Sequence, residues 1–410
     1  MAEQASVQCC IAGGGPAGMV AGLLLARAGC RVTVLEKHAD FLRDFRGDTI
    51  HPSTMAIMHE LGLLERLLAL PHQKVVHLSG TFGGETIPFA DFSHLPGPAP
   101  FIALMPQWDF LDFLAGEAKR YPGFRLLMCA EATGLVEEQG RVAGVRFREP
   151  DGAGEIHAPL VIAADGRHST LRAAAGLEVR DLGAPMDVLW FRLSRRPQDS
   201  AETMGRFLPG TIVVTLNRGD YWQCAFVIPK GGIEAVKAAG LPALRERIGR
   251  VLPFGADRAE EIDSWDKVKL LTVTVDRLTT WYRPGLLCIG DAAHAMSPIG
   301  GVGINLAVQD AVAMANLLHT AIRDNRVTTA DLAAVQRRRL FPTRVIQRLQ
   351  LVIQNNVVAP TLSTERPLRA PWPVRLLSKW PLLQRIPARV LGLGIRPEHV
   401  AADLRAAEPR

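Results

Sequence analysis

The stretch that decides the fold lies near the N-terminus, where residues 7–36 read VQCCIAGGGPAGMVAGLLLARAGCRVTVLE. The apolar run at residues 7–12 predicts a buried strand, which leads into the G-x-G-x-x-G pattern of residues 13–18. Residues 19–28 predict a helix, residues 31–35 a second strand, and Glu36 follows that strand. This order predicts a βαβ unit that binds a dinucleotide, against the alternative of a plain glycine turn.

Each residue type in this unit has a mechanical reason. Gly13 permits the tight turn, Gly15 lets the backbone approach a pyrophosphate, and Gly18 lets the helix pack closely on the strand. The helix N-terminus attracts an anion, and Glu36 can accept hydrogen bonds from ribose hydroxyls. The predicted cofactor-binding residues of this unit are Gly13, Gly15, Ala17, Gly18, Glu36 and Lys37.

Two later segments also pair a strand with an acid. Residues 160–164 run into Asp165, and residues 286–289 run into Gly290 and Asp291. In parallel α/β sheets, ligands bind outside the carboxyl ends of the strands. Each acid is therefore expected to accept hydrogen bonds from a cofactor hydroxyl, to cap a helix, or to do both.

A glycine-rich loop follows Asp291 and precedes a predicted helix at residues 304–323. Its glycines, which include Gly301 and Gly303, would let the backbone touch a flat ligand. The helix N-terminus would then direct partial positive charge at that ligand. An isoalloxazine ring, which gains negative charge on reduction, suits such a place.

Composition bounds the remaining choices. The chain has 410 residues, with 48% apolar and 21% charged residues, which is typical of a soluble globular protein of two or three domains. The net charge is +6, but residues 331–410 alone hold 14 Lys or Arg against 5 Asp or Glu. No nucleic-acid motif or secretory signal is present, no apolar run is long enough to span a bilayer, and the six cysteines lack metal-ligand spacing. We therefore expect a cytoplasmic protein with no metal and no nucleic-acid partner.

Together the three motifs resemble those of single-component FAD-dependent aromatic hydroxylases of the p-hydroxybenzoate hydroxylase type. The resemblance covers about residues 5–350. It implies an α/β fold in which a Rossmann-like FAD-binding domain of the glutathione reductase type is interrupted by a mainly antiparallel sheet domain. The domains are then residues 1–75, 101–180 and 271–330 for FAD, 76–100 and 181–270 for substrate, and 331–410 for a helical, basic and apolar tail.

The resemblance also implies site residues and a reaction. Arg46 and Gln107 would contact the cofactor, Asp165 would serve FAD and the nicotinamide, and Asp291 would hold the ribityl chain. Gly301, Gly303, Ile304 and Asn305 would contact the flavin, with Pro298 near the oxygen chemistry. NADH or NADPH would reduce FAD, and a flavin hydroperoxide formed with dioxygen would hydroxylate an aromatic or polycyclic, fairly apolar substrate.

Several assignments stay open from sequence alone. The predicted substrate pocket holds Trp190, Arg192, Trp222, Gln223 and Phe226, with Arg192 either binding an acidic substrate or pointing outward. His51 either faces the active site or lies in a turn, His294 is either structural or a base, and Arg167 and Arg172 either bind a nicotinamide phosphate or lie on the surface. The oligomeric state is not predicted.

The tail allows two interpretations. Residues 361–400 mix Trp and Leu with Arg and Lys, so they either contact a membrane peripherally or pack an apolar face on the FAD domain. Arg337, Arg338 and Arg339 predict a solvated helix face. The alternative function is a membrane-associated flavoprotein that acts on a quinone precursor or an isoprenoid lipid. A halogenase is disfavoured because its W-x-W signature is absent.

Overall fold

The computed structural model describes residues 7–42, 49–200 and 203–407. Its first layer is a six-stranded sheet in the order β20-β21-β12-β1-β2-β8, in which all strands except β20 are parallel. The strands are β1 (Cys9–Ala12), β2 (Val32–Leu35), β8 (Phe124–Leu127), β12 (Leu160–Ala163), β20 (Tyr282–Arg283) and β21 (Leu286–Cys288). The central strands are buried along their whole length because they are covered on both faces.

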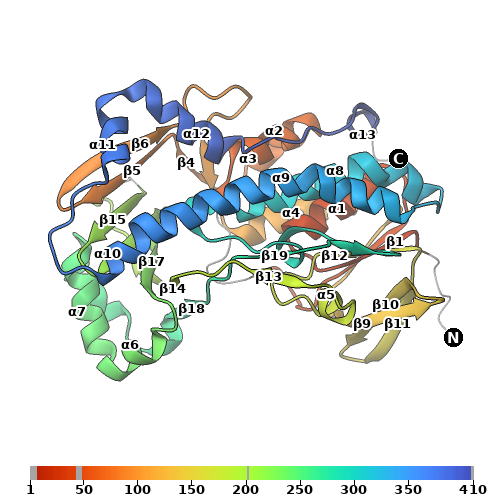
Figure 1. Cartoon of the computed structure of the whole chain (residues 1–410), viewed down its shortest axis with the longest axis horizontal. Helices are drawn as coiled ribbons and strands as arrows, with labels where there is room; N and C mark the ends of the chain where they lie inside the picture. The colour runs from red at the N-terminus through yellow and green to blue at the C-terminus, as the bar shows by residue number, and fades with distance from the viewer. Residues whose placement is uncertain (1–6, 43–48, 201–202, 408–410) are drawn as a thin grey trace.

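Helices cover this sheet, and the longest of them runs along the length of the molecule (Figure 1). They are α1 (Pro16–Arg27), α4 (Gln107–Ala118), α8 (Gly303–Arg323) and α9 (Thr329–Ile353). Helix α1 packs between α8 and α4, and α9 lies on α8. A three-stranded antiparallel sheet packs near β12 and consists of β9 (Glu131–Glu138), β10 (Arg141–Glu149) and β11 (Gly152–His157).

The second layer of strands lies at the other end of the molecule (Figure 1). It is a seven-stranded sheet in the order β18-β14-β17-β16-β15-β5-β6, antiparallel except where β15 meets β5. Its strands are β5 (His77–Phe82), β6 (Glu85–Asp91), β14 (Met186–Ser194), β15 (Met204–Leu208), β16 (Thr211–Asn217), β17 (Tyr221–Pro229) and β18 (Lys269–Leu271). The two predicted insertions therefore meet in one sheet, although β18 crosses the boundary placed at residue 270.

Short elements connect these layers. Two small sheets join β3 (Thr49–Ile50), β7 (Ile102–Leu104) and β4 (Gln73–Val75), and β13 (Val179–Asp181) with β19 (Asp276–Leu278). The shorter helices before residue 300 are α2 (Pro52–Glu60), α3 (Leu64–Leu68), α5 (Thr170–Ala174), α6 (Ile233–Ala239) and α7 (Leu241–Val251). Short 3₁₀ turns are η1 (Ala259–Glu261), η2 (Trp265–Lys267), η3 (Gly290–Ala292) and η4 (Ile299–Gly301).

The C-terminal tail is helical, as predicted. After α9 come a π-helical turn η5 (Gln354–Val358), α10 (Ala359–Ser363), α11 (Trp372–Lys379), the 3₁₀ turn η6 (Pro381–Gln384), α12 (Arg385–Gly392) and α13 (Ala402–Ala406). Helices α11 and α12 pack mainly on β6, so this part of the tail lies largely on the seven-stranded sheet. Residues 390–395 also pack against α8 through Val302 and Leu306.

One helical segment, residues 299–323, is long and apolar enough to cross a membrane by length and composition alone, and 78% of its most apolar window is buried inside the protein.

Candidate active site

Four strands of the six-stranded sheet end at one edge. Because β1, β2, β12 and β21 are parallel neighbours, their carboxyl ends place the glycine loop, Glu36, Asp165 and Asp291 along that edge. Ligands of parallel sheets bind in this position. The structure thus brings together three motifs that lie far apart in the sequence.

The glycine loop forms a cradle in front of α1. A Cβ on Gly13 would lie 2.3 Å from the carbonyl oxygen of Ala164, and one on Gly18 would lie 1.9 Å from that of Gly13. These two glycines hold the strand and the helix in close contact. A Cβ on Gly15 would meet no atom of the described residues within 4 Å, and none of their side chains caps the α1 N-terminus. The open space and the helix N-terminus fit a pyrophosphate.

Glu36 closes one side of this cradle. Its carboxylate accepts hydrogen bonds from the backbone N–H of Gly14 and from that of His38, both at 3.0 Å. It also lies 2.6 Å from the His38 Nδ1. These contacts fix the carboxylate beside the glycine loop, and the predicted contact with ribose stays a prediction. Lys37, the next predicted residue, is exposed.

Asp165 has the contacts of a helix cap. One carboxylate oxygen accepts a 2.5 Å hydrogen bond from the Ser169 hydroxyl, and the other accepts from the backbone N–H of Leu171 in α5. Burial raises the pKa of this carboxyl, although these hydrogen bonds oppose the shift. Of the two roles left open by the sequence, capping is the one that these contacts show.

Asp291 lies in η3, directly after β21. Its carboxylate is about one-third exposed and forms a 3.5 Å ion pair with Arg167. The loop is fixed from behind, since Gly290 has a positive φ of 59° and its N–H donates to Asp310. Ala17 of α1 packs on the same glycine, so Asp291 and the α1 N-terminus are held side by side. Arg172, in contrast, is buried against Asp276, which argues against a role in binding a nicotinamide.

Loss of the Asp291 carboxylate is expected to weaken FAD binding by about 10- to 100-fold. The reason is that a charged hydrogen-bond acceptor is worth about 1.5–3 kcal/mol. The dissociation constant of FAD from deflavinated Asp291→Ala protein, measured by flavin fluorescence, checks this. Arg167→Gln is the matched control, because it removes the ion pair and leaves the acceptor. An equal loss in both variants, or an unchanged constant in Asp291→Ala, would contradict the assignment.

The N-terminus of α8 forms the second half of the candidate site. Pro298 precedes η4, in which Gly300 and Gly301 have φ values of 77° and 62° that favour glycine. A Cβ on Gly301 would lie 2.4 Å from the Thr49 Oγ1, whereas one on Gly303 would meet nothing within 4 Å. Within the described parts of the chain no side chain caps α8, and the first turn of α8 holds no acid. The helix N-terminus around Gly303 and Ile304 can thus receive the electron-rich edge of a flavin.

The Asn305 side chain has a different task from its backbone. Its Oδ1 accepts from the backbone N–H of His51 at 3.0 Å and from the Thr54 hydroxyl at 2.7 Å. Its Nδ2 donates to the carbonyl oxygens of Thr49 and Gly301. The side chain therefore ties residues 49–54 to the start of α8, and only the N–H is left for the predicted cofactor contact.

His51 is buried beside this network. Its Nδ1 lies 2.7 Å from the carbonyl oxygen of Leu391 in α12, which fixes the ring against the tail. Burial lowers the pKa of His51 from 6.5 to about 4, against the smaller opposite effect of that hydrogen bond. The ring is therefore neutral at pH 7, and its role in catalysis stays a prediction.

We expect this histidine to make stability depend on pH. The unfolded chain protonates His51 near pH 6.5 while the folded chain does not, so stability falls as the pH drops from 6.5 toward 4. At pH 5 the loss from this residue is about 2 kcal/mol. Urea unfolding at pH 7 and pH 5 checks this: the wild type should lose about 2 kcal/mol more than His51→Asn. Equal losses in the two proteins would refute it.

The structure gives less support to two other residues that are predicted to contact the cofactor. Gln107 opens α4 and is partly exposed, and none of the hydrogen bonds found in the described segments involves its side chain. Arg46 lies outside the described residues.

The prediction that five residues line one substrate pocket is wrong. In the pairing of β14 with β17, Arg192 lies opposite Gln223, and Trp190 lies opposite Ala225, so these side chains share one face. Trp222 and Phe226 alternate to the other face and are buried with residues of α7. The sheet pleat separates the five residues, because successive side chains along a strand point to opposite sides.

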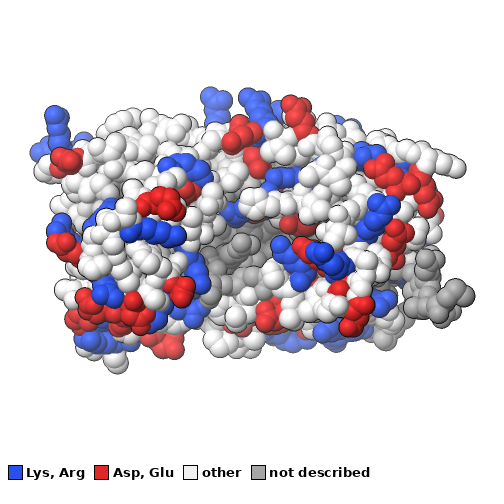
Figure 2. Space-filling view, turned by 90° about the horizontal axis from the view of Figure 1, so that it is seen from below, with Lys and Arg blue, Asp and Glu red and all other residues white. Residues whose placement is uncertain are grey.

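The first of these faces belongs to the candidate active site. Ile299 of η4 packs against a buried apolar cluster on this face that includes Val188 and Val227, and Trp190 packs against the same cluster. Arg192 is exposed at the strand end, where its guanidinium stacks 4.9 Å from the centre of the Tyr221 ring. Figure 2 shows a hollow near the middle of the molecule, with both basic and acidic side chains around its rim.

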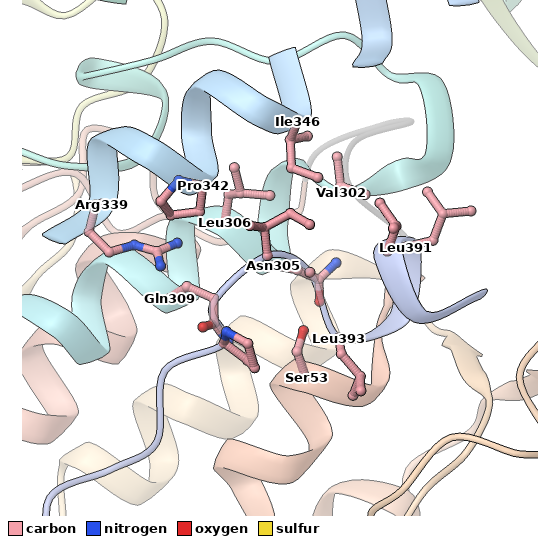
Figure 3. A pocket seen from close by; sticks show the side chains of 14 residues that line it. Ser53, Val302, Asn305, Leu306, Gln309, Arg339, Pro342, Ile346, Leu391 and Leu393 are labelled. Atoms are coloured by element: carbon pink, nitrogen blue, oxygen red, sulfur yellow. The ribbon is translucent and has the colours of Figure 1, made fainter. Parts of the chain in front are cut away.

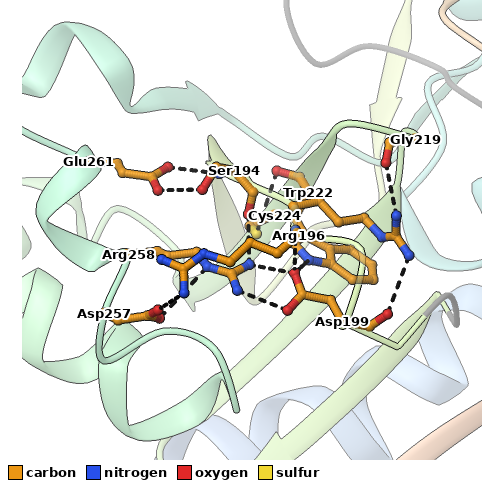
Figure 4. A network of polar contacts seen from close by, with 10 residues as sticks. Ser194, Arg196, Asp199, Gly219, Trp222, Cys224, Asp257, Arg258 and Glu261 are labelled. Atoms are coloured by element: carbon orange, nitrogen blue, oxygen red, sulfur yellow. Dashed lines mark hydrogen bonds and ion pairs between the residues drawn. The ribbon is translucent and has the colours of Figure 1, made fainter.

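The opposite face is held by a buried ion pair (Figure 4). Arg258 contacts both carboxylate oxygens of Asp199, at 2.5 and 2.8 Å, and this pairing holds the pKa of the carboxyl well below its usual range. The Trp222 Nε1–H donates to the same carboxylate, and the Trp222 ring stacks on Phe254. Trp222 therefore has a structural role in this layer.

A buried charged network lies behind the loop that carries Gly290 and Asp291. The sequence motifs do not predict this network. Asp310 of α8 contacts His294 at 2.6 Å and Arg339 at 2.9 Å, and Arg339 also contacts Glu398 of the tail. Burial opposes ionisation of Asp310, but His294 and Arg339 outweigh it and hold the pKa of Asp310 below its usual value. His294 is thus structural, and Arg339 is not on the solvated face that was expected.

Next to this network is a cavity of about 20 Å³ between α8, α9, α2 and residues 390–397. Figure 3 shows Asn305, Gln309 and Arg339 around it, with Leu391 and Leu393 of the tail on the other side. It has room for a water molecule or two. It is too small for an aromatic substrate.

Comparison with known proteins decides the family. A family model described as "FAD binding domain" matches residues 6–349. The chain belongs to this FAD-binding family. A relative, 6-methylpretetramide 4-monooxygenase from Streptomyces rimosus, is 32% identical and covers 98% of this chain and 96% of its own length. Para-nitrophenol 4-monooxygenase from Pseudomonas sp. (strain WBC-3) is 26% identical, with 81% and 82% covered.

Two solved structures have the same fold. Anhydrotetracycline hydroxylase from Streptomyces rimosus superposes with a TM-score of 0.74 at 22% identity, over 95% of this chain and 76% of that one. The p-nitrophenol 4-monooxygenase of Pseudomonas putida DLL-E4 also gives 0.74, at 19% identity, over 93% and 96%. The predicted fold class, the FAD cofactor and the resemblance to FAD-dependent aromatic hydroxylases are confirmed. The protein is an FAD-dependent monooxygenase.

Proposed function

We propose that this monooxygenase hydroxylates a fused-ring phenolic compound, using NADH or NADPH and dioxygen. The observation that carries the proposal is the apolar sheet face that packs on η4 beside the α8 N-terminus. Its side chains offer contact to aromatic rings, and Arg192, which would suit a small carboxylate, is exposed and stacked on Tyr221. Names of relatives agree, since they include methylpretetramide and tetracycline compounds as well as phenols.

The residues of this chain would position the reactants. FAD, when bound, supplies electron transfer from the nicotinamide and the activation of dioxygen. The α1 N-terminus would bind its pyrophosphate, Asp291 would accept from the ribityl chain, and the α8 N-terminus would stabilise negative charge on the ring. The apolar face around Trp190 would hold the substrate and exclude water.

The alternative substrate class, a quinone precursor or isoprenoid lipid, has less support. The names of the two relatives refer to a nitrophenol and to methylpretetramide rather than to a lipid, which favours the hydroxylase. We also propose that the enzyme acts on its small-molecule substrate in a reducing compartment. All six cysteines are unpaired, which is usual for proteins of such compartments.

Anaerobic stopped-flow spectroscopy tests the substrate class. The flavin absorbance would be followed with NADH or NADPH in the presence of phenol, a naphthol, a hydroxyanthraquinone or anhydrotetracycline. We expect flavin reduction to accelerate tenfold or more only with the multi-ring compounds, and a product 16 mass units heavier to form in air. Acceleration by monocyclic phenols alone would refute the fused-ring assignment.

Two tryptophans provide a matched pair for the same assay. Trp190→Leu should raise the KM for the multi-ring compound about tenfold and leave FAD binding unchanged, because only this tryptophan shares a face with η4. Trp222→Leu should lower thermal stability instead, since Trp222 is buried on the opposite face. A KM that responds equally to both substitutions would contradict the placement of the substrate.

A further inference from the structure

Helices α11 and α12, joined by η6, form an outlying corner of the molecule over the edge of the seven-stranded sheet (Figure 1). Their inner side is anchored. Ala370 is buried with Phe82 and Ile87, and Ala388 is buried with Phe92 and Leu95. These contacts hold the segment on the sheet and determine which of its side chains face outward.

The outer side carries large apolar residues in solvent. Trp372 is 72% exposed, Trp380 62%, Leu382 68%, Ile386 62% and Leu376 41%. Exposed basic residues lie between them in the sequence, namely Arg375, Lys379, Arg385 and Arg389. We call these nine residues the outer tail face. A monomeric protein rarely exposes so many large apolar side chains together without a binding role.

The charge of the chain is concentrated in this segment. Residues 364–396 hold seven Arg or Lys and one Glu, which gives +6, the same as the net charge of the whole chain. The remaining residues are therefore neutral in sum. A second copy of this chain would present the same positive charge, so self-association through this face is opposed by repulsion. An anionic partner is the complementary one.

The mixture of apolar and basic residues on the outer tail face favours a lipid surface over an acidic protein as its partner. The cores of protein interfaces are depleted of lysine and other charges, whereas here each exposed apolar residue has a basic residue within four positions. At a bilayer this pattern is favourable, because Trp, Leu and Ile enter the headgroup region while Lys and Arg reach the phosphates. Tryptophan is enriched at this depth of a bilayer.

We propose that the outer tail face docks the enzyme on bilayers that contain anionic lipid. The proposal does not depend on the identity of the substrate. Docking would bring the edge of the seven-stranded sheet, on which α11 and α12 pack, to the lipid surface. The enzyme would remain peripheral, since the face inserts side chains and no spanning helix.

Co-sedimentation of the FAD-loaded full chain with vesicles tests this. Vesicles of phosphatidylcholine alone would be compared with vesicles that also contain phosphatidylglycerol, each in a low-salt and in a high-salt NaCl buffer. We expect the partition coefficient at low salt to be at least tenfold higher for the anionic vesicles and to fall at least fivefold at high salt. Binding equal on both vesicles, or no binding, would overturn the proposal.

Variants separate insertion from simple charge attraction. Trp372→Ser with Trp380→Ser should lower the partition coefficient at least fivefold, and both positions are exposed enough to keep the fold and the flavin absorbance. Arg375→Gln with Lys379→Gln should do the same, whereas Lys119→Gln with Arg125→Gln, exposed charges on the FAD domain, should not. Equal loss in the last variant would overturn the proposal. Retention on immobilised poly-L-glutamate without vesicle binding would assign the face to an acidic protein instead.

Discussion

Gly15→Val is expected to abolish FAD binding while the apoprotein stays folded. The backbone at Gly15 has a φ of −72° and a ψ of −177°, which valine adopts readily, and a Cβ there would lie more than 4 Å from the rest of the described structure. The valine side chain would occupy the space in front of the α1 N-terminus, where the pyrophosphate is proposed to bind. We expect the dissociation constant of FAD to rise at least 1000-fold and the stability of the apoprotein to fall by only about 1 kcal/mol.

Gly18→Ala is the control for this prediction. A Cβ at Gly18 would lie 1.9 Å from the carbonyl oxygen of Gly13, which is backbone and cannot move without separating β1 from α1. This variant should therefore lose stability before it loses cofactor selectively. Flavin titration and urea unfolding of both deflavinated proteins check the contrast. Tight FAD binding by Gly15→Val would refute the placement of the pyrophosphate.

The βαβ unit and the sheet class could be predicted because their signals are local. The glycines, the apolar runs and Glu36 are close neighbours in the sequence, and each has a conformational reason that holds in any fold. Asp165 shows the limit of this reasoning. An acid after a strand suits both a ligand and a helix cap, and only the hydrogen bond from the backbone N–H of Leu171 shows that capping is realised.

The substrate pocket could not be predicted, because alternation along a strand gives two faces without saying which one meets the active site. Trp222 and Gln223 are adjacent in the sequence and point to opposite sides of the sheet. The contact that decides between the faces comes from Ile299, which is distant from both in the sequence. Long-range packing of this kind has no local signal in one sequence.

The buried network escaped prediction for a related reason. Arg337, Arg338 and Arg339 are chemically identical, but the helix places them at different angles, so only one faces the core. The side chain of Arg339 is 2% exposed and that of Arg338 is 50% exposed. A clue was present in Asp310, an acid within the apolar stretch of α8, because a buried charge requires a partner.

Arg339→Met is expected to destabilise the protein by about 3–5 kcal/mol, since it leaves Asp310 and Glu398 buried without their shared cation. Asp310 also accepts the hydrogen bond of Gly290, so the loop that carries Asp291 should loosen and FAD affinity should fall as well. Arg338→Met removes the other cation on Glu398, but at an exposed position, and should cost about 0–1 kcal/mol. Urea unfolding of the two deflavinated variants measures the difference. If Arg339→Met lost as little free energy of unfolding as Arg338→Met, Arg338 could replace the buried arginine. The tail would then not be anchored through Arg339 to the loop that carries Asp291.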